Sequence, residues 1–387
     1  MRFSKKIVNV QMSGIRKMFD LATKDSINLG LGEPDFQPPP HVIQALTDAM
    51  KAGYNKYGPT NGIPPLRRAI ADDMNRTLEA QGRHAGFDGE KAVTPDNIIV
   101  TSSGTEAFMA TFRALFEKGD EVLCPNPGFV IYGPQTTLVD AKPVDYSLSY
   151  DNGFVPDIKE LQELTGKKTK GLILNSPNNP TGSVISKKGV EELARFAHDN
   201  RLTVISDDVY EKITYEEPHN SFIGLADDLV VINSFSKTYA LTGWRIGYIA
   251  APKAAVEQLS KSHYYITACS PSPIQHAVLA ALTGPQDFVT DMVADYRRRR
   301  DIIVDELNAI PGMECLKPKG AFYAFPRFSK KIKSQDLAME CLKHGLICSP
   351  GTAFGDRGEG HLRFSYAASQ DNIRKGIGIL GKVMKTI

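Results

Sequence analysis

Short apolar runs alternate with helical patterns through the middle of this chain, and this alternation restricts the fold more than any other feature. Runs of this length are typical of strands that are buried on both faces, as in parallel sheets covered by helices. The sequence therefore predicts an α/β fold with a mainly parallel sheet between helices. The expected strands are 98–101, 121–124, 171–175, 202–206 and 229–233, with helices at 105–117 and 187–199.

The two ends of the chain differ from this middle part. Residues 27–40 are rich in Gly and Pro, so we expect an irregular segment that crosses between domains. An amphipathic helix is expected near residues 15–22. We predict a large domain over residues 45–285 and a smaller α+β domain built from residues 1–44 and 286–387. The elements expected in the tail are 288–308, 321–325, 335–342, 362–366 and 371–384.

The composition is that of a soluble globular protein, with 42% hydrophobic and 23% charged residues among 387. A net charge of +2 argues against nucleic acid or an acidic membrane as a partner. The four arginines at residues 297–300 are interpreted as a solvated helix face rather than a polyanion site.

The cysteines indicate the compartment. An odd, dispersed set of five without metal-type spacing is typical of reduced thiols in a cytosolic protein, and we expect no metal site. The first residues lack the apolar core of a signal peptide, and no apolar run reaches membrane-spanning length. We therefore expect a cytoplasmic protein without a membrane partner. The cysteines are Cys124, Cys269, Cys315, Cys341 and Cys348.

The stretch SFSKTYALTGWRIGY places Lys237 just after the expected strand at 229–233. Ser234 and Ser236 flank the lysine, and Arg245 follows. A lysine can form an imine with a carbonyl, while serines and an arginine can bind a phosphate. Pyridoxal phosphate has both groups, so we favour a cofactor lysine over a solvated lysine in a Ser/Thr loop.

A second anion-binding candidate is TSSGTEAF, which places Ser103, Gly104 and Thr105 between a strand and a helix. Free N–H groups at a helix start and two hydroxyls can bind a phosphate. An ordinary helix cap explains the same residues equally well. The absence of GxxxxGK[ST] disfavours an ATP-type loop.

Polar residues also follow two other expected strands. In NSPNNPTG, Asn179 can present an amide donor, although this segment is turn-forming in any case. In SDDVYEKI, Asp207 and Tyr210 can face one ligand, where a carboxylate would keep a heteroaromatic nitrogen protonated. The alternative is that Asp207 or Asp208 caps the next element.

Two further residues suit such a ligand. Phe129, in CPNPGFVIYG, could stack on a flat ring, although such a residue is more often plain core. Arg363, in HLRFSYA, could bind a carboxylate through two hydrogen bonds, and the alternative is a surface arginine.

Taken together, these segments resemble the class I aminotransferases of the fold-type I pyridoxal-phosphate superfamily, in the aspartate/aromatic branch. The resemblance implies a large domain with a mainly parallel seven-stranded sheet, and a homodimer with active sites at the subunit boundary. The blocks that carry it, in order, are SGIRKMFDLA, LGLGEPDF, KYGPTNGIPPLR, NSPNNPTG, SDDVYE, SFSKTYALTGWRIGY, PKGAFYAFP, PGTAFG and LRFSYA.

The resemblance also implies residue roles around the cofactor ring. Lys237 would be the Schiff-base lysine, and Asp207 would pair with the pyridine nitrogen. Tyr210 and Asn179 would bind the ring oxygen, and Phe129 would stack on the ring.

Other roles implied by the resemblance concern the phosphate and the substrate. Gly32, Asn179 and Arg363 would receive the substrate carboxylate. Tyr57 is similar to a tyrosine that family members contribute to the phosphate site of the neighbouring subunit. The residues implied for the phosphate site of the same subunit are Ser103, Gly104, Thr105, Ser234, Ser236 and Arg245.

The implied reaction moves an amino group from an L-amino acid to 2-oxoglutarate, by a ping-pong mechanism through pyridoxamine phosphate. Lys237, once released, would act as the general base. Some aspartate enzymes of this branch carry a lysine where this chain has Thr105, so both aspartate and aromatic donors are open. Arg16 or another basic residue could replace that lysine.

Two other functions fit the same motifs. A C–S lyase on this fold would release ammonia and pyruvate without an acceptor. A non-catalytic sensor on an aminotransferase scaffold would carry an added DNA-binding segment, for which the short N-terminal arm leaves no room. Absorbance discriminates them from a transaminase, because a suitable donor should bleach the yellow cofactor–lysine imine.

Overall fold

The computed structural model describes residues 1–10 and 25–387, so the helix expected at 15–22 and Arg16 lie outside the described residues. Within the described ranges, no helix is both long and apolar enough to cross a membrane. All five cysteines lie in these ranges as free thiols, as the sequence predicted.

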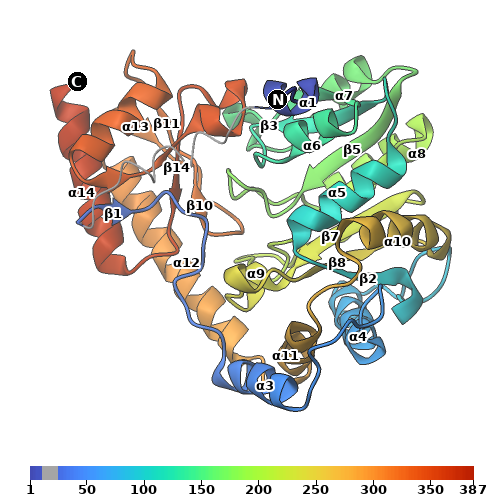
Figure 1. The fold of residues 1–387 in the computed structure, drawn as a ribbon. Coiled ribbons are helices and arrows are strands. Elements are labelled where there is room, and N and C mark those ends of the chain that lie inside the picture. Colours follow the sequence, from blue (N-terminus) through green and yellow to red (C-terminus); the bar gives the residue numbers. More distant parts are fainter. Residues whose placement is uncertain (11–24) are drawn as a thin grey trace.

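A seven-stranded sheet with the order β2-β8-β7-β6-β5-β3-β4 forms the centre of the larger part of the molecule (Figure 1). The pairs β3–β4, β3–β5, β5–β6 and β6–β7 are parallel, whereas β8 is antiparallel to both of its neighbours. The prediction of a mainly parallel seven-stranded sheet is confirmed. Its strands are β2 Ile98–Thr101, β3 Glu121–Asn126, β4 Lys142–Ser147, β5 Thr169–Asn175, β6 Thr203–Asp207, β7 Leu229–Ser234 and β8 Gly247–Ala250.

Two of these strands were not assigned from the sequence. Strand β4 lies at an edge of the sheet, and most of its residues are exposed or only partly buried. A continuous apolar run is therefore absent there, and the pattern used for the other strands fails. Strand β8 is buried and lies in an apolar run that begins at Ile246, directly after the lysine loop, but this run was not assigned as a strand.

Helices cover both faces of the sheet (Figure 1). Ile173 and Ile205 pack on one face with side chains of α5 and α10, whereas Leu172 and Val204 pack on the other with side chains of α4, α8 and α11. Alternate residues of each strand are thus buried on opposite faces. The helices of this part are α3 Pro40–Lys51, α4 Pro64–Ala80, α5 Gly104–Leu115, α6 Tyr132–Leu138, α7 Ile158–Leu164, α8 Lys187–Asn200, α9 Phe235–Thr238, α10 Lys253–Thr267 and α11 Ser272–Thr283.

The C-terminal part is built on the long helix α12 (Asp287–Asn308), which packs against α14. A three-stranded antiparallel sheet, β10-β14-β13, accompanies two pairs of short strands. The other elements are α1 Lys5–Asn9, β1 Ile27–Asn28, β9 Met313–Glu314, β10 Tyr323–Ala324, β11 Arg327–Phe328, α13 Ser334–Lys343, β12 Leu346–Ile347, β13 Ser349–Pro350, β14 Leu362–Ser365 and α14 Gln370–Thr386.

A separate apolar cluster holds this part together, with Ile303, Leu337 and Ile377 among its members. Strand β1 contributes from the N-terminal side, because it pairs with β12 in parallel. We keep the division into residues 45–285 and residues 1–44 with 286–387 as a proposal. This separate cluster supports it for the C-terminal part, whereas α1 packs against α6 of the larger part.

The interpretation of residues 297–300 as a solvated face was wrong for half of the run. Arg297 and Arg298 are more than half exposed, but Arg299 and Arg300 are buried. Arg300 pairs with Glu216 and stacks on Tyr215. A helix turns two of four consecutive side chains toward the interior, where carboxylates and aromatic rings can stabilise a guanidinium.

Candidate active site

A cavity of about 280 Å³ lies at the carboxyl ends of β5, β6 and β7, the edge at which open α/β sheets bind ligands. Every site residue expected from the sequence lines this cavity except Tyr57. The predicted residues brought together are Gly32, Ser103, Gly104, Thr105, Phe129, Asn179, Asp207, Tyr210, Ser234, Ser236, Lys237, Arg245 and Arg363.

Lys237 lies on α9, directly after β7, and its side chain is half-buried in the cavity. The Nζ atom donates a hydrogen bond to the Gly32 carbonyl at 2.7 Å. Burial lowers the pKa of Lys237 to about 8. The nearby Glu33 carboxylate raises this pKa, whereas the positive charges of Arg363 and Arg245 lower it further. More of the amine is therefore neutral near pH 8 than in a solvated lysine, as a nucleophile or base requires.

Asp207 is the last residue of β6 and is buried. Burial raises the pKa of Asp207 to about 7. The carboxylate accepts hydrogen bonds from the Tyr132 hydroxyl and the Val209 N–H, and both of these lower its pKa in part. A cationic ligand group would return this carboxyl to its charged form. Tyr132 was missed by the sequence analysis, because it comes from α6 and meets Asp207 only in the folded chain.

The hydroxyls of Tyr210 and Tyr323 lie 2.6 Å apart. Burial raises the pKa of both tyrosines, so both are neutral and can donate a proton to a hydrogen bond near neutral pH. Tyr323 was not named from the sequence, although the block PKGAFYAFP that contains it was noted. Its position on β10 places it in the cavity.

The turn between β2 and α5 has unusual backbone geometry. Ser103 has a φ of +84°, which a residue with a side chain rarely adopts. Its side chain does not cap α5, so its hydroxyl is not used by the helix that Gly104 begins. Next to this turn, the hydroxyls of Ser234 and Ser236 lie 2.9 Å apart, and Arg245 lines the same cavity. Hydroxyls, helix N–H groups and a guanidinium together suit a phosphate.

Arg363 lies on β14 and is buried, so the alternative of a surface arginine is wrong. Its guanidinium lies 4.6 Å from the ring centroids of Tyr323 and Phe354. It donates to Asn179 Oδ1 at 3.1 Å and to the Gly30 carbonyl. Its Nε atom is buried and has no hydrogen-bond partner within residues 1–10 and 25–387. A buried unpaired donor is costly, which points to an acceptor that a ligand would supply.

Asn175 is a further residue that the sequence analysis did not name. Its side chain accepts a hydrogen bond from the Asn179 N–H at 2.8 Å and donates to the Asp207 carbonyl at 2.9 Å. Asn175 thus joins the loop that carries Asn179 to the strand end that carries Asp207. The only signal was that NSPNNPTG begins with this residue.

The two aromatic candidates differ in placement. Phe129 lines the cavity, and its ring meets Tyr132 edge-on with centroids 5.9 Å apart. Tyr57 is 91% exposed and does not line the cavity of its own chain. The role implied for Tyr57 across a dimer interface stays a prediction.

Behind this cavity, Asp208, Glu211 and His219 present potential metal-ligand atoms within 4.8 Å of one another. His219 Nε2 lies 3.2 Å from Asp208, and the Lys212 ammonium lies 3.0 Å from Asp73. The lysine supplies positive charge to this acidic cluster, so side chains alone can balance it.

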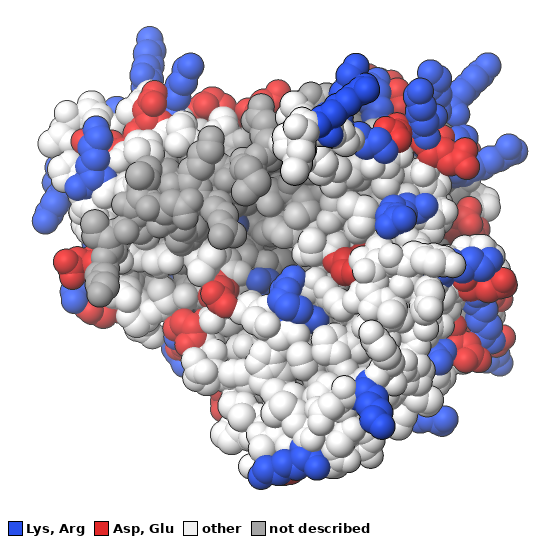
Figure 2. All heavy atoms as spheres, viewed as in Figure 1, with Lys and Arg blue, Asp and Glu red and all other residues white. Residues whose placement is uncertain are grey.

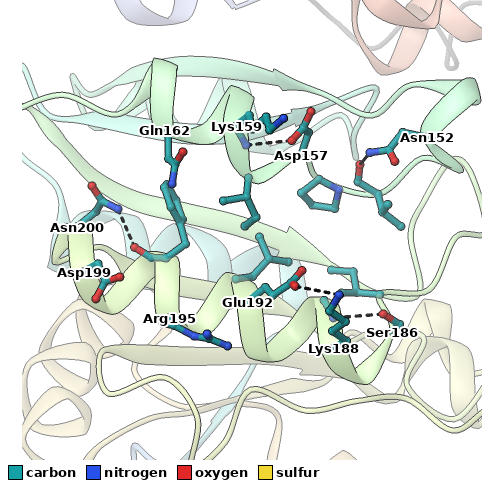
Figure 3. A pocket seen from close by; sticks show the side chains of 17 residues that line it. Asn152, Asp157, Lys159, Gln162, Ser186, Lys188, Glu192, Arg195, Asp199 and Asn200 are labelled. Atoms are coloured by element: carbon teal, nitrogen blue, oxygen red, sulfur yellow. Dashed lines mark hydrogen bonds and ion pairs between the residues drawn. The ribbon is translucent and has the colours of Figure 1, made fainter.

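A larger hollow lies on the outer surface between α7 and α8 (Figure 3). Its polar groups are used locally, because Lys188 pairs with Glu192 and Asp157 caps α7 through the Lys159 N–H. None of the site residues expected from the sequence lines it. The site residues expected from the sequence line the smaller cavity around Lys237 instead.

Comparisons with known proteins identify the family of this chain. The family model described as aminotransferase class I and II matches residues 24–380. The chain belongs to this family. A probable aspartate aminotransferase of Methanocaldococcus jannaschii is 41% identical to this chain, and the match covers 99% of this chain and 100% of that protein. The aspartate aminotransferase of Pyrococcus abyssi is 38% identical over 100% of this chain and 99% of that protein.

Solved structures give the same result for the fold. The aromatic aminotransferase of Pyrococcus horikoshii OT3 is 36% identical and has a TM-score of 0.88, covering 96% of this chain and 99% of that one. The expectation of a fold-type I aminotransferase is confirmed, and this enzyme is a transaminase.

Proposed function

We propose that this aminotransferase uses pyridoxal 5′-phosphate to move an amino group from an L-amino acid to 2-oxoglutarate, in two half-reactions of ping-pong type. Aspartate or an aromatic amino acid would be the donor, in line with the names of similar proteins. The observation that carries the proposal is the buried Nε of Arg363, which has no partner among the described residues and lies in the same cavity as the Lys237 amine. A substrate carboxylate could accept the missing hydrogen bond from this guanidinium, and the substrate would then lie next to a nucleophile.

The residues around Lys237 fit the proposed cofactor. The Ser103 hydroxyl, which the helix does not use, and the free N–H groups at the start of α5 suit the phosphate, together with Ser236 and Arg245. Asp207 lies deep in the cavity and suits a cationic ring nitrogen, because a positive partner would offset its cost of burial.

When bound, pyridoxal phosphate would supply a carbonyl that reacts with amines and a ring that stores electrons. Asp207 would hold a proton at the ring nitrogen, and the neutral Tyr210 hydroxyl would donate to the ring oxygen. Lys237 Nζ, with its lowered pKa, would take a proton from the substrate Cα and return it. Arg363 and Asn179 would orient the carboxylate so that this Cα–H faces the amine.

The side chains that line the rest of the cavity bear on which amino donor the enzyme accepts. Leu31, Ile131 and Phe129 add apolar surface to the cavity. Thr105 offers a hydroxyl where a strict dicarboxylate enzyme would benefit from a cation. These side chains support an aromatic donor at least as well as aspartate.

Replacement of the reacting amine tests the proposal. Lys237→Ala should lower turnover of aspartate or an aromatic donor with 2-oxoglutarate by at least about 1,000-fold, because both nucleophile and base are lost. Steady-state rates across amino donors measure this, and Lys253→Ala, at an exposed lysine of α10, serves as the control. Absence of 2-oxoglutarate-dependent turnover with every donor in the unmodified enzyme would refute the proposal. Release of ammonia without an acceptor would indicate elimination instead.

We also propose a cytoplasmic homodimer with shared active sites and no nucleic-acid or membrane partner. Tyr54, Tyr57, Tyr264 and Tyr265 are each at least half exposed. Figure 2 shows that the face over α3, α10 and α11 carries few charged side chains. The exposed aromatic residues and the weakly charged face each support burial against a second copy of the chain.

A further inference from the structure

The irregular segment at residues 30–36, which we call the strap, contacts both cations of the proposed reaction. The Gly30 carbonyl accepts a hydrogen bond from Arg363, and the Gly32 carbonyl accepts one from Lys237 Nζ at 2.7 Å. The carbonyls of two nearby strap residues thus face the carboxylate-binding guanidinium and the reacting amine.

Regular secondary structure does not hold the strap in place. Residues 32–38 make no backbone–backbone hydrogen bond with any other described residue. Side-chain contacts must therefore set the position of the Gly32 carbonyl. One such contact is made by Glu33, which accepts a hydrogen bond from the Thr242 hydroxyl.

The strongest anchor lies at the far end of the strap, on α12. Arg299 Nη1 lies 2.7 Å from Asp35, and its Nη2 lies 2.7 Å from Asp295. The same guanidinium lies over the rings of Phe36 and Tyr296, at 5.2 and 5.5 Å from their centroids. Its side chain is 9% exposed. An arginine that is paired with two carboxylates and packed between aromatic rings has little conformational freedom, so α12 fixes the position of this end of the strap.

We propose that Arg299 is a positioning residue for Lys237. Through Asp35 it holds the strap so that the Gly32 carbonyl binds Nζ and keeps the amine close to Arg363. This inference rests on the proposed function, in which Lys237 is the reacting amine. Without the carbonyl, the long lysine side chain would be distributed over several rotamers, and fewer of them would reach the substrate.

The first test reads the amine directly, in protein without cofactor. In Arg299→Gln, acylation of Lys237 by acetic anhydride at neutral pH should be severalfold faster than in the unmodified protein. The reason is that the hydrogen bond to the Gly32 carbonyl holds Nζ inside the cavity, so its loss exposes the amine to the reagent. Mass spectrometry of the labelled peptide measures the rate. Arg297→Gln is the matched control, because it removes the same charge from an exposed position of α12.

The second test uses the cofactor-loaded enzyme. Arg299→Gln should lower kcat by roughly 10-fold to 100-fold, the loss expected from a misplaced reacting group, with a smaller change in KM for the amino donor. Arg299→Lys should restore part of kcat, since it keeps the charge opposite Asp35. Asp35→Asn should reproduce the Arg299→Gln effects. It would replace Arg299→Gln in both tests if Arg299→Gln does not fold.

The outcomes separate the two proposals. If Arg299→Gln and Asp35→Asn label at Lys237 like Arg297→Gln, the positioning role is overturned, even where kcat falls. If the unmodified enzyme shows no transamination, the proposed function fails. The labelling rates would then still decide whether Arg299 controls the Lys237 amine.

Discussion

In this cavity, burial moves the pKa values of an acid and a base toward each other. Burial raises the pKa of Asp207 to about 7 and lowers the pKa of Lys237 to about 8. Near neutral pH, both groups lie close to the midpoint between their charged and uncharged forms. A bound ligand can therefore change the protonation of either group at small free-energy cost.

The shifted pKa of Asp207 has a consequence for stability. The folded state binds the proton more tightly than the unfolded state, so unfolding free energy of the cofactor-free protein falls as pH rises from about 4 to about 7. Asp207→Asn removes this ionisation. Its unfolding free energy relative to the unmodified protein should therefore rise by up to roughly 4 kcal/mol over that range.

Denaturant unfolding of the cofactor-free proteins at several pH values measures this difference. Asp151→Asn, at an exposed carboxylate, is the control and should show no comparable trend. A relative stability of Asp207→Asn that does not change between pH 4 and 7 would show that the carboxyl is not held uncharged by burial.

At the scale of elements, the antiparallel strand β8 connects the two segments proposed to bind phosphate. Gly247 is paired with Thr101 of β2 on one side and Ser234 of β7 on the other. A Cβ atom at Gly247 would lie 2.6 Å from the Asn233 carbonyl oxygen and 2.9 Å from the Gly104 nitrogen. Because both are backbone atoms, neither can move aside without shifting the start of α5 or the end of β7.

Gly247→Ala should therefore destabilise the fold by about 1 to 3 kcal/mol and weaken retention of pyridoxal phosphate. Thermal unfolding and dialysis against phosphate buffer measure the two effects. Gly243→Ala is the matched control, because a Cβ atom there meets nothing within 4 Å. Equal stability and cofactor retention in the two variants would contradict this account of β8.

At the scale of the whole molecule, the cavity joins distant parts of the chain. Gly32 precedes the large sheet, Lys237 follows its sixth strand in sequence, and Arg363 belongs to the C-terminal sheet. The Gly30 and Gly32 carbonyls bridge these parts through the strap. Tyr57, which is exposed and outside this cavity, is available to a second subunit.

Mixed dimers test whether the sites are shared. A dimer of one Lys237→Ala subunit and one Tyr57→Ala subunit would contain one site with both defects and one with neither, if each Tyr57 serves the other subunit. Equal mixing of the denatured variants and refolding should then restore roughly a quarter of the unmodified activity, since half of the dimers are mixed.

Steady-state rates before and after co-refolding measure this recovery. Each variant refolded alone is the control and should stay at its own low rate. If the mixture shows only the average of the two separate rates, Tyr57 does not act across the interface.

The sequence by itself determined the parallel sheet and named most of the residues that line the cavity around Lys237. Buried strands such as β5 and β6 are continuous apolar runs, and the polar residues that end them, Asp207 among them, must meet at one edge of a parallel sheet. The motif around Lys237 adds hydroxyls and a cation at fixed local spacing. Both signals are local, so they can be read without the fold.

Only the tertiary structure decided which distant side chains tune these groups. Tyr132 reaches Asp207, Tyr323 reaches Tyr210, and Arg299 turns inward to the strap although its run of arginines looks like a solvated face. Hydropathy describes whether a residue tends to be buried, but it does not specify the partner that makes burial of a polar group favourable. That partner comes from another element, so it exists only once the chain has folded.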